Sequence, residues 1–370
     1  MKFTEITPKG KVLTKPVKAV LSIIAIALFA LLAVLAQNGS SYILKAVIQK
    51  GAVYAVLAVS MNLLNGFSGL FSLGQAGFML LGALTYSILA IPVEMKETVY
   101  SYVGVSPIIA NVHLPWVLAM ICAGIVAAIF ALIIGLPVLR LKGDYLAIAT
   151  LGFAEIVRAL VVSDELKTVT NGSYPLKSFP IFNNIYVPLI IAAVCLVIIL
   201  LLINSTYGRA FKAIRDDEIA AEAMGINLAH HKRLAFVISS FFAGVGGAML
   251  AMFQTTISSK SFMVTMTYEI LLIVVIGGIG SVTGSIIASF LYIACSEWWL
   301  RFLDTPIAGV PLLKNGFRMV VFSVVIMIVV LFWRKGIMGD KELTWDRIYT
   351  FFSSIKKKFK KSEKGGVINE

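Results

Sequence analysis

The chain has 370 residues, of which 59% are hydrophobic and only 14% are charged, and its mean hydropathy is +0.92. Soluble domains average about 45–50% apolar and about 25% charged residues, so this composition excludes an ordinary soluble protein and indicates an integral membrane protein. The net charge of +13 is concentrated in terminal tails and short loops, which favours attraction to an anionic membrane surface over nucleic-acid binding.

Apolar runs recur along the chain, and a spanning helix needs roughly 20 mainly apolar residues. The sequence predicts an all-α membrane domain over 19–333 with about ten spans, between a basic N-terminal tail (1–18) and a basic C-terminal tail (334–370). Because the eighth and ninth runs are short, 267–300 could be two spans or one broken re-entrant element. The predicted spans are 19–36, 46–64, 75–91, 115–138, 144–162, 185–203, 234–253, 267–280, 284–300 and 316–333.

The lysine and arginine residues predict the orientation, because loops on the cytoplasmic side are enriched in them. Both tails, the segment 204–233 and the loop with Arg140 and Lys142 are basic. With an even number of spans, both termini lie in the cytoplasm and the loops 92–114 and 163–184 lie outside a bacterial-type plasma membrane. The first apolar run is longer than the core of about 7–15 residues typical of a signal peptide, which favours a retained span.

Signals for catalysis or metal binding are weak. The three cysteines lie inside apolar runs without the spacing of a metal site, and the three histidines lie in loops. A glycine-rich run over 277–284 lacks the Lys-Ser/Thr pair that a phosphate-binding loop requires. We therefore expect no catalytic residue, no metal site and no cofactor bound by this chain.

The segment 204–233, between the sixth and seventh spans, carries the most informative pattern. Strong helix formers run through it, Ser205 or Thr206 could cap its start, and Gly225 stands where a helix would end in a left-handed residue. Its acidic residues fit poorly with a helix lying on anionic lipid, which favours a helix that docks on a partner protein over a membrane-surface connector. These acids are Asp216, Asp217, Glu218 and Glu222.

This segment resembles the cytoplasmic coupling segment of the branched-chain amino-acid ABC permeases, particularly their larger, M-type subunit. Its Glu-Ile-Ala-Ala stretch and the glycine that follows are similar to the Glu-Ala-Ala-x-x-x-Gly loop of ABC importers, with Ile219 as one extra residue. The resemblance implies that this loop docks on an ATPase subunit and transmits its closure. The implied coupling residues are Gly208, Arg209, Arg215, Asp216, Asp217, Glu218, Ala220, Ala221, Glu222 and Gly225.

Other stretches resemble the same family, so that the resemblance covers roughly 50–335. They include Ser-Leu-Gly-Gln-Ala at 72–76, the run 139–158 and the glycine-rich run. Polar residues in these stretches could pack helices together or line the translocation path, and Glu155 and Arg158 could pair inside the bundle. The candidates for the path are Ser72, Gln75, Thr150, Glu155, Arg158, Tyr268 and Glu269.

The resemblance implies the membrane-spanning permease subunit of an ATP-driven importer for branched-chain amino acids. Implied partners are a homologous second permease, two cytosolic ATPase subunits that bind ATP and Mg, an external solute-binding protein and membrane lipid. Two alternatives stay open: a permease of the same superfamily for urea, nucleosides or sugars, and an ion-coupled transporter with Glu155 and Glu269 as coupling carboxylates. The outer stretch 170–176 lacks two glycines that the family commonly carries, so the preferred amino acid is not specified.

Overall fold

The structure, a computed structural model of the whole chain, describes residues 42–299 without interruption. The chain divides into two compact units, and the fold described here is that of the unit Ser40–Lys341. The predicted spans 19–36 and 316–333 and the two basic tails fall largely outside the described residues, so their limits stay predictions. Outside the continuous part, the described positions are 31, 33–39, 321, 324, 327, 336–339 and 342.

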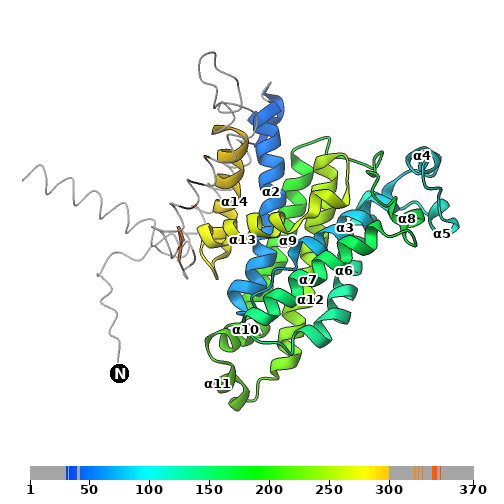
Figure 1. Cartoon of the computed structure of the whole chain (residues 1–370). Helices are drawn as coiled ribbons and strands as arrows, with labels where there is room; N and C mark the ends of the chain where they lie inside the picture. Colours follow the sequence, from blue (N-terminus) through cyan, green and yellow to red (C-terminus); the bar gives the residue numbers. More distant parts are fainter. Residues whose placement is uncertain are drawn as a thin grey trace, which may run out of the picture. The chain divides into compact units, whose positions relative to one another are not determined.

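The described part of the chain is helical, apart from one isolated antiparallel bridge between Leu176 and Ile257 (Figure 1). This confirms the all-α class. The elements are α2 (Tyr42–Asn62), the π-helix η1 (Leu63–Phe67), α3 (Gln75–Ala90), α4 (Val93–Val99), α5 (Pro107–Ala110), α6 (Trp116–Val138), α7 (Asp144–Val162), α8 (Lys167–Thr170), α9 (Tyr186–Asn204), α10 (Thr206–Asp216), α11 (Glu218–Ala223), α12 (Leu228–Gln254), the 3-10 helix η2 (Ser259–Phe262), α13 (Val264–Gly277) and α14 (Val282–Glu297).

Five of these helices are long and apolar enough to cross a membrane: α2 continued by η1, α6, α7, α9 and α12. Each coincides with a predicted span. α3, α13 and α14 also coincide with predicted spans but are shorter, with 16, 14 and 16 residues. At about 1.5 Å per residue they extend about 21–24 Å, less than the ~30 Å of the hydrocarbon core. The total of ten spans stays a prediction.

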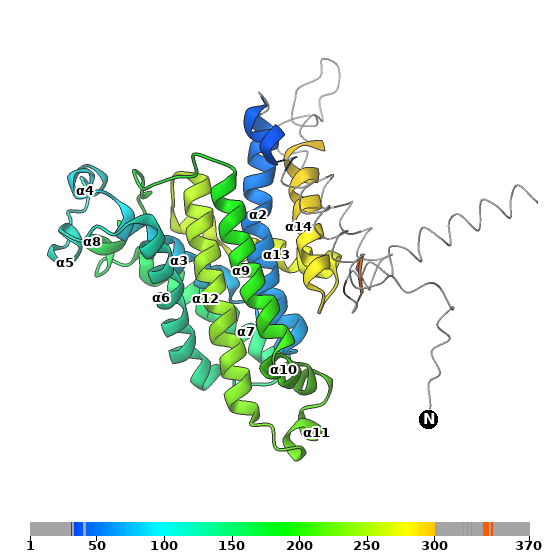
Figure 2. The ribbon, with the colours of Figure 1, turned by 180° about the vertical axis from the view of Figure 1, so that it is seen from behind.

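The centre of the bundle is formed by α2, α3 and α12, which Figure 2 shows from the back. Most residues of α2 and α12 are buried, whereas only about a third of those of α6, α7 and α9 are. Glycines let α3 and α12 approach closely: a Cβ on Gly82 would lie 2.1 Å from the carbonyl oxygen of Gly244, and one on Gly247 would lie 2.1 Å from that of Met79. In lipid, such close packing replaces the hydrophobic effect as the force between helices.

The region 267–300 contains two short helices, α13 and α14, joined by a sharp turn at Gly278–Ser281. Gly278 and Gly280 have φ values of +114° and +86°, which favour glycine because it lacks a Cβ. The N–H groups of Ile337 and Met338 donate to the carbonyls of Ile276 and Gly277 at 2.7 and 3.2 Å, so a later segment of the chain packs on the same turn.

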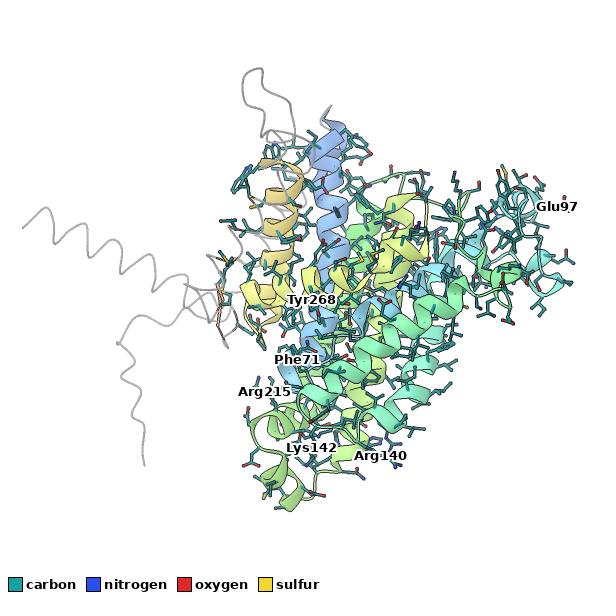
Figure 3. All side chains as sticks on the ribbon, viewed as in Figure 1. Phe71, Glu97, Arg140, Lys142, Arg215 and Tyr268 are labelled. Atoms are coloured by element: carbon teal, nitrogen blue, oxygen red, sulfur yellow. The ribbon has the colours of Figure 1, made fainter. Side chains whose placement is uncertain are left out.

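Short helices cover the two ends of the bundle (Figure 1). At one end α4, α5 and α8 form a cap, which we define as residues 92–114 and 163–180. Its Lys96 is 1% exposed, and its ammonium donates to the carbonyls of Ile109 and Val112. Burial lowers the pKa of Lys96. The other end carries α10 and α11, together with Arg140 and Lys142 (Figure 3).

Candidate coupling segment and pathway face

The segment between α9 and α12 folds as two helices, which corrects the expectation of one continuous docking helix. α10 ends at Asp216, and Asp217 adopts an extended conformation, with φ −161° and ψ 114°. The carboxylate of Asp217 accepts hydrogen bonds from the N–H groups of Ile219 and Ala220, at 2.9 and 3.0 Å. Aspartate side chains compete with helical backbone in this way, and Asp217 therefore ends one helix and caps the next.

The predicted cap at the start of the segment is not formed, whereas the predicted left-handed residue at its end is present. Ser205 stands at the N-cap position of α10, but its hydroxyl donates to the carbonyl of Leu202 at 2.6 Å rather than accepting from a free N–H of α10. Gly225 has a φ of +85°, so the left-handed residue predicted at the end is confirmed. Gly208 lies against the preceding turn, where a Cβ would be 2.1 Å from the carbonyl oxygen of Ile203.

The two helices use their apolar side chains differently. Phe211 and Ile214 of α10 are 0% and 2% exposed and anchor this helix to the bundle. Ile219 of α11 and Met224 just beyond it are 82% and 83% exposed. These two exposed apolar side chains lie on the segment for which the sequence predicts docking on a partner, and that role stays a prediction. We call Ile219, Glu222 and Met224 the α11 surface.

Three of the four acids are engaged inside the chain, which sequence reasoning did not anticipate. Asp216 pairs with Arg215 at 2.9 Å, Asp217 caps α11, and Glu218 accepts from Lys232 of α12 at 2.7 Å. Glu222 is exposed on α11. Most of the acidic residues therefore cap or anchor α11, and the side chains that α11 exposes to solvent are mainly apolar. Of the remaining coupling residues, Arg209 and Ala220 are exposed and Ala221 is buried.

Three path candidates, Ser72, Gln75 and Thr150, are buried within this chain, at 5%, 5% and 0% exposed. The amide of Gln75 donates to the hydroxyl of Ser60 at 2.8 Å, and the hydroxyl of Thr150 accepts from the N–H of Leu73 at 3.0 Å. The hydroxyl of Ser72 accepts from the N–H of Gly74, the residue just before α3, at 3.4 Å. These contacts fix the irregular stretch between η1 and α3, and a place for these residues on the path stays a prediction.

Glu155 and Arg158 form the ion pair that the sequence predicts, with 2.6 Å between a guanidinium nitrogen and a carboxylate oxygen. The pair is not inside the bundle of this chain, however, because its side chains are 37% and 34% exposed. α7 packs on its neighbours through a stripe that includes Thr150, Ala154 and Val157, and the two charged residues lie beside this stripe.

The exposed side of α7 differs from the exposed sides of α6 and α9. Neither α6 nor α9 contains a charged residue, so lipid suits both. A charged pair facing hydrocarbon is costly, and intramembrane charges usually face protein or water-filled cavities. Tyr268 of α13 and Phe71 are 49% and 42% exposed, and Figure 3 shows them on the side where α7 and α13 are seen. We call Glu155, Arg158, Tyr268 and Phe71 the pathway face.

Glu269 belongs to a polar cluster between α2, α13 and α14. The hydroxyl of Tyr54 donates to its carboxylate at 3.5 Å. Lys50 forms an ion pair with Glu297 at 2.5 Å, and its ammonium lies 5.8 Å from the centre of the Tyr54 ring. Sequence reasoning missed Lys50, Tyr54 and Glu297. The signal was present, since Lys50 and Glu297 are charges within predicted spans.

No group of three or more His, Cys, Asp or Glu that could hold a metal ion occurs among the described residues. The cysteines are free thiols: Cys195 is buried in α9, and Cys122 and Cys295 are half-buried in α6 and α14.

Comparisons with known proteins match the sequence of this chain to a transport family. The family described as "Branched-chain amino acid transport system / permease component" matches residues 43–331. The permease LivM of the high-affinity branched-chain amino acid transport system of Escherichia coli K12 is 32% identical over 279 residues, which is 66% of this chain but only 61% of LivM.

Two other relatives are more distant. A probable branched-chain amino acid permease, LivH of Methanocaldococcus jannaschii, is 24% identical over 59% of this chain and 67% of its own length. The L-arabinose permease AraH of Escherichia coli K12 is 30% identical over 39% of this chain and 45% of its own length. No solved structure matches the chain. The chain belongs to the family of permease components of branched-chain amino acid transport systems.

Proposed function

We propose that this chain is the membrane-spanning permease subunit of an ATP-driven importer for branched-chain, hydrophobic amino acids. Its partners are a homologous second permease, two cytosolic ATPase subunits that bind ATP and Mg, and an external solute-binding protein. The family supports the substrate class, and the likeness to both LivM and LivH permeases supports a pair of related subunits. The observation that carries the proposal is the α11 surface, with Ile219 and Met224 more than four-fifths exposed.

The mechanism is alternating access driven from the α11 surface. Closure of the ATPase dimer moves α11, and α10 transmits this movement because Phe211 and Ile214 anchor it to the bundle. The pathway face lines the route shared with the second permease. There, the Glu155–Arg158 pair gains the protein or water environment that a charged pair requires within a membrane.

The α10–α11 end lies in the cytoplasm in this proposal, and the cap lies outside. The support is the distribution of basic residues: Arg140, Lys142 and the three bases of α10 lie at the first end, whereas the whole cap carries three lysines, at 96, 167 and 177. An excess of Lys and Arg in the loops at one end predicts that this end lies on the cytoplasmic side.

Cysteine labelling in intact cells checks this orientation. Tyr102→Cys, on the exposed cap, should react with a membrane-impermeant thiol reagent, and Glu222→Cys on α11 should react only after permeabilisation. The parental chain, with its three native cysteines, gives the background. Labelling of Glu222→Cys in intact cells would reverse the orientation.

Uptake into liposomes tests the transport function itself. The chain, a second permease, both ATPase subunits and a binding protein should together take up radiolabelled leucine only when ATP reaches the ATPase side. Unlabelled isoleucine and valine should compete, whereas arabinose, urea and nucleosides should not. Competition by arabinose would favour the sugar alternative. Uptake that needs no ATP and stops when a proton gradient is collapsed would favour an ion-coupled transporter.

A further inference from the structure

The side chain of Arg215 lies at a junction between the coupling segment and two breaks in the membrane helices. The first break follows α2, where η1 and the irregular stretch 68–74 replace regular α-helix. The second is the turn between α13 and α14. Irregular backbone at membrane depth needs partners within the protein for its polar groups. Arg215 supplies one such partner.

The carbonyl of Gly66 is the group that Arg215 binds. In a regular α-helix this carbonyl would accept from the N–H of Leu70, but that N–H donates to the carbonyl of Leu64 instead, at 3.1 Å. A guanidinium N–H of Arg215 donates to the Gly66 oxygen at 3.1 Å. The end of the helix at Phe67 leaves this acceptor without a partner in its own helix, and a charge-assisted hydrogen bond from another element satisfies it.

Glycines from both breaks make room for this arginine. Gly69 has a φ of +71°, and a Cβ there would lie 2.9 Å from Cγ of Arg215. Gly280, with a φ of +86°, would place a Cβ 3.2 Å from a guanidinium nitrogen of Arg215. Gly66 also approaches the second break, since its Cβ would lie 2.5 Å from the backbone nitrogen of Gly280. The glycines at 66, 69 and 280 therefore form a seat that any side chain would narrow.

Asn62 ties the two breaks to each other. This last residue of α2 is 0% exposed. Its amide group donates to the carbonyl of Ser281 at 2.9 Å and to the hydroxyl of Ser285 at 2.8 Å, and its carbonyl accepts from the N–H of Gly280 at 2.8 Å. A fully bonded buried amide holds its neighbours in one geometry. A displacement of η1 is therefore transmitted to the turn between α13 and α14.

The guanidinium of Arg215 also binds Asp216, the last residue of α10. Two of its N–H groups donate to one carboxylate oxygen of Asp216, at 3.1 and 2.9 Å. Asp216 directly precedes Asp217, which caps α11. The planar guanidinium can hold two partners in fixed directions, which the single charge of a lysine cannot do. Arg215 is thus joined to α11 through the main chain at Asp216 and Asp217, is hydrogen-bonded to the first break at Gly66, and lies against the second break at Gly280.

We propose that Arg215 is a positioning residue that carries displacements of α11 into the membrane breaks and so couples the ATPases to the pathway. The proposal rests on the proposed function. The stretch 68–74 contains Phe71, and α13, the helix that ends at the second break, carries Tyr268 ten residues before that break, so both breaks are connected to the pathway face. In Figure 3, Arg215 is seen beside Phe71 and below Tyr268. A shift of Arg215 therefore alters the pathway face without direct contact between that face and α11.

The test uses the complete importer in liposomes, with uptake and ATP hydrolysis measured together. Arg215→Gln should leave the ATPase subunits bound and hydrolysing ATP, because the α11 surface is intact. The amount of leucine taken up per ATP should fall about ten-fold or more, since a hydrogen bond to a charged group is lost. The ratio for Arg215→Lys should lie between that of the wild type and that of Arg215→Gln. Arg140→Gln, which alters an exposed arginine of another loop, is the matched control and should keep the wild-type ratio.

Two results would overturn the proposal. One is a wild-type ratio of uptake to hydrolysis in both Arg215 variants. The other is a loss of ATPase binding in Arg215→Gln as large as that in variants of the α11 surface, which would make Arg215 a docking residue. If the glutamine variant does not assemble, the lysine variant decides. The proposed function fails separately, when the importer with the unchanged chain takes up leucine without ATP.

Discussion

The double replacement Ile219→Glu and Met224→Glu should abolish binding of the ATPase subunits while leaving the permease folded in the membrane. Both side chains are more than four-fifths exposed, so their replacement does not disturb the bundle. If these residues lie at an interface, each introduced glutamate is a charge that binding would bury. Anchor residues of this kind contribute about 2 kcal/mol or more each to the free energy of binding. The expected loss of affinity is about a thousand-fold, measured as ATPase co-purification with the detergent-solubilised permease.

Ile108→Glu provides the matched control for this prediction. Ile108 is 80% exposed but lies on the cap, at the other end of the bundle, so its replacement should leave ATPase binding unchanged. Glu222→Ala should weaken binding less than the double variant, because it removes one charge from the rim of the surface without introducing a repulsive group. Wild-type ATPase binding by the double variant would show that the α11 surface is not the docking site.

Replacing Gly247 with valine should prevent the chain from accumulating as a folded protein. A Cβ there would lie 2.1 Å from the carbonyl oxygen of Met79, in the backbone of α3. Because the obstacle is backbone rather than a flexible side chain, α3 and α12 have to separate. Overpacking typically costs 1–3 kcal/mol and occasionally more, and we expect about 3 kcal/mol or more at this contact. Thermal unfolding in detergent and the fraction of monodisperse protein measure the effect.

Gly152→Ala is the control for this second prediction. Gly152 lies on α7, and a Cβ there would meet no atom within 4 Å, so alanine should leave the unfolding temperature unchanged or raise it slightly. Gly82→Val, on the facing helix, should be as damaging as the change at Gly247, since its Cβ would lie 2.1 Å from the carbonyl oxygen of Gly244. Normal stability of both valine variants would mean that α3 and α12 are not packed this closely.

The membrane helices were predictable from the sequence because lipid imposes a simple condition on composition and length. The predicted span 115–138 and the observed α6 differ by one residue, and the span 144–162 has the same limits as α7. The positive φ at Gly225 was also predictable, since helices commonly end in a left-handed glycine. Each of these features depends on residues close together in the sequence.

The features that depend on distant contacts were not predictable in this way. The break at Asp217 is local and was missed for another reason: it interrupts a run of strong helix formers that contains several acidic side chains, of which Asp217 caps α11. The exposure of Glu155 and Arg158 depends on which face of α7 its neighbours cover. The seat around Arg215 brings together glycines more than two hundred residues apart, so no local pattern could reveal it.

The break at Asp217 also separates the coupling segment into two parts that can diverge independently during evolution. α10 is committed to the membrane domain, since Phe211 and Ile214 are buried in it. α11 has one buried residue, Ala221, and its outward side chains are free to change with the surface of the partner. A gene duplication could therefore supply a permease with a different ATPase by changes confined to residues 218–224. The membrane helices would be inherited unchanged.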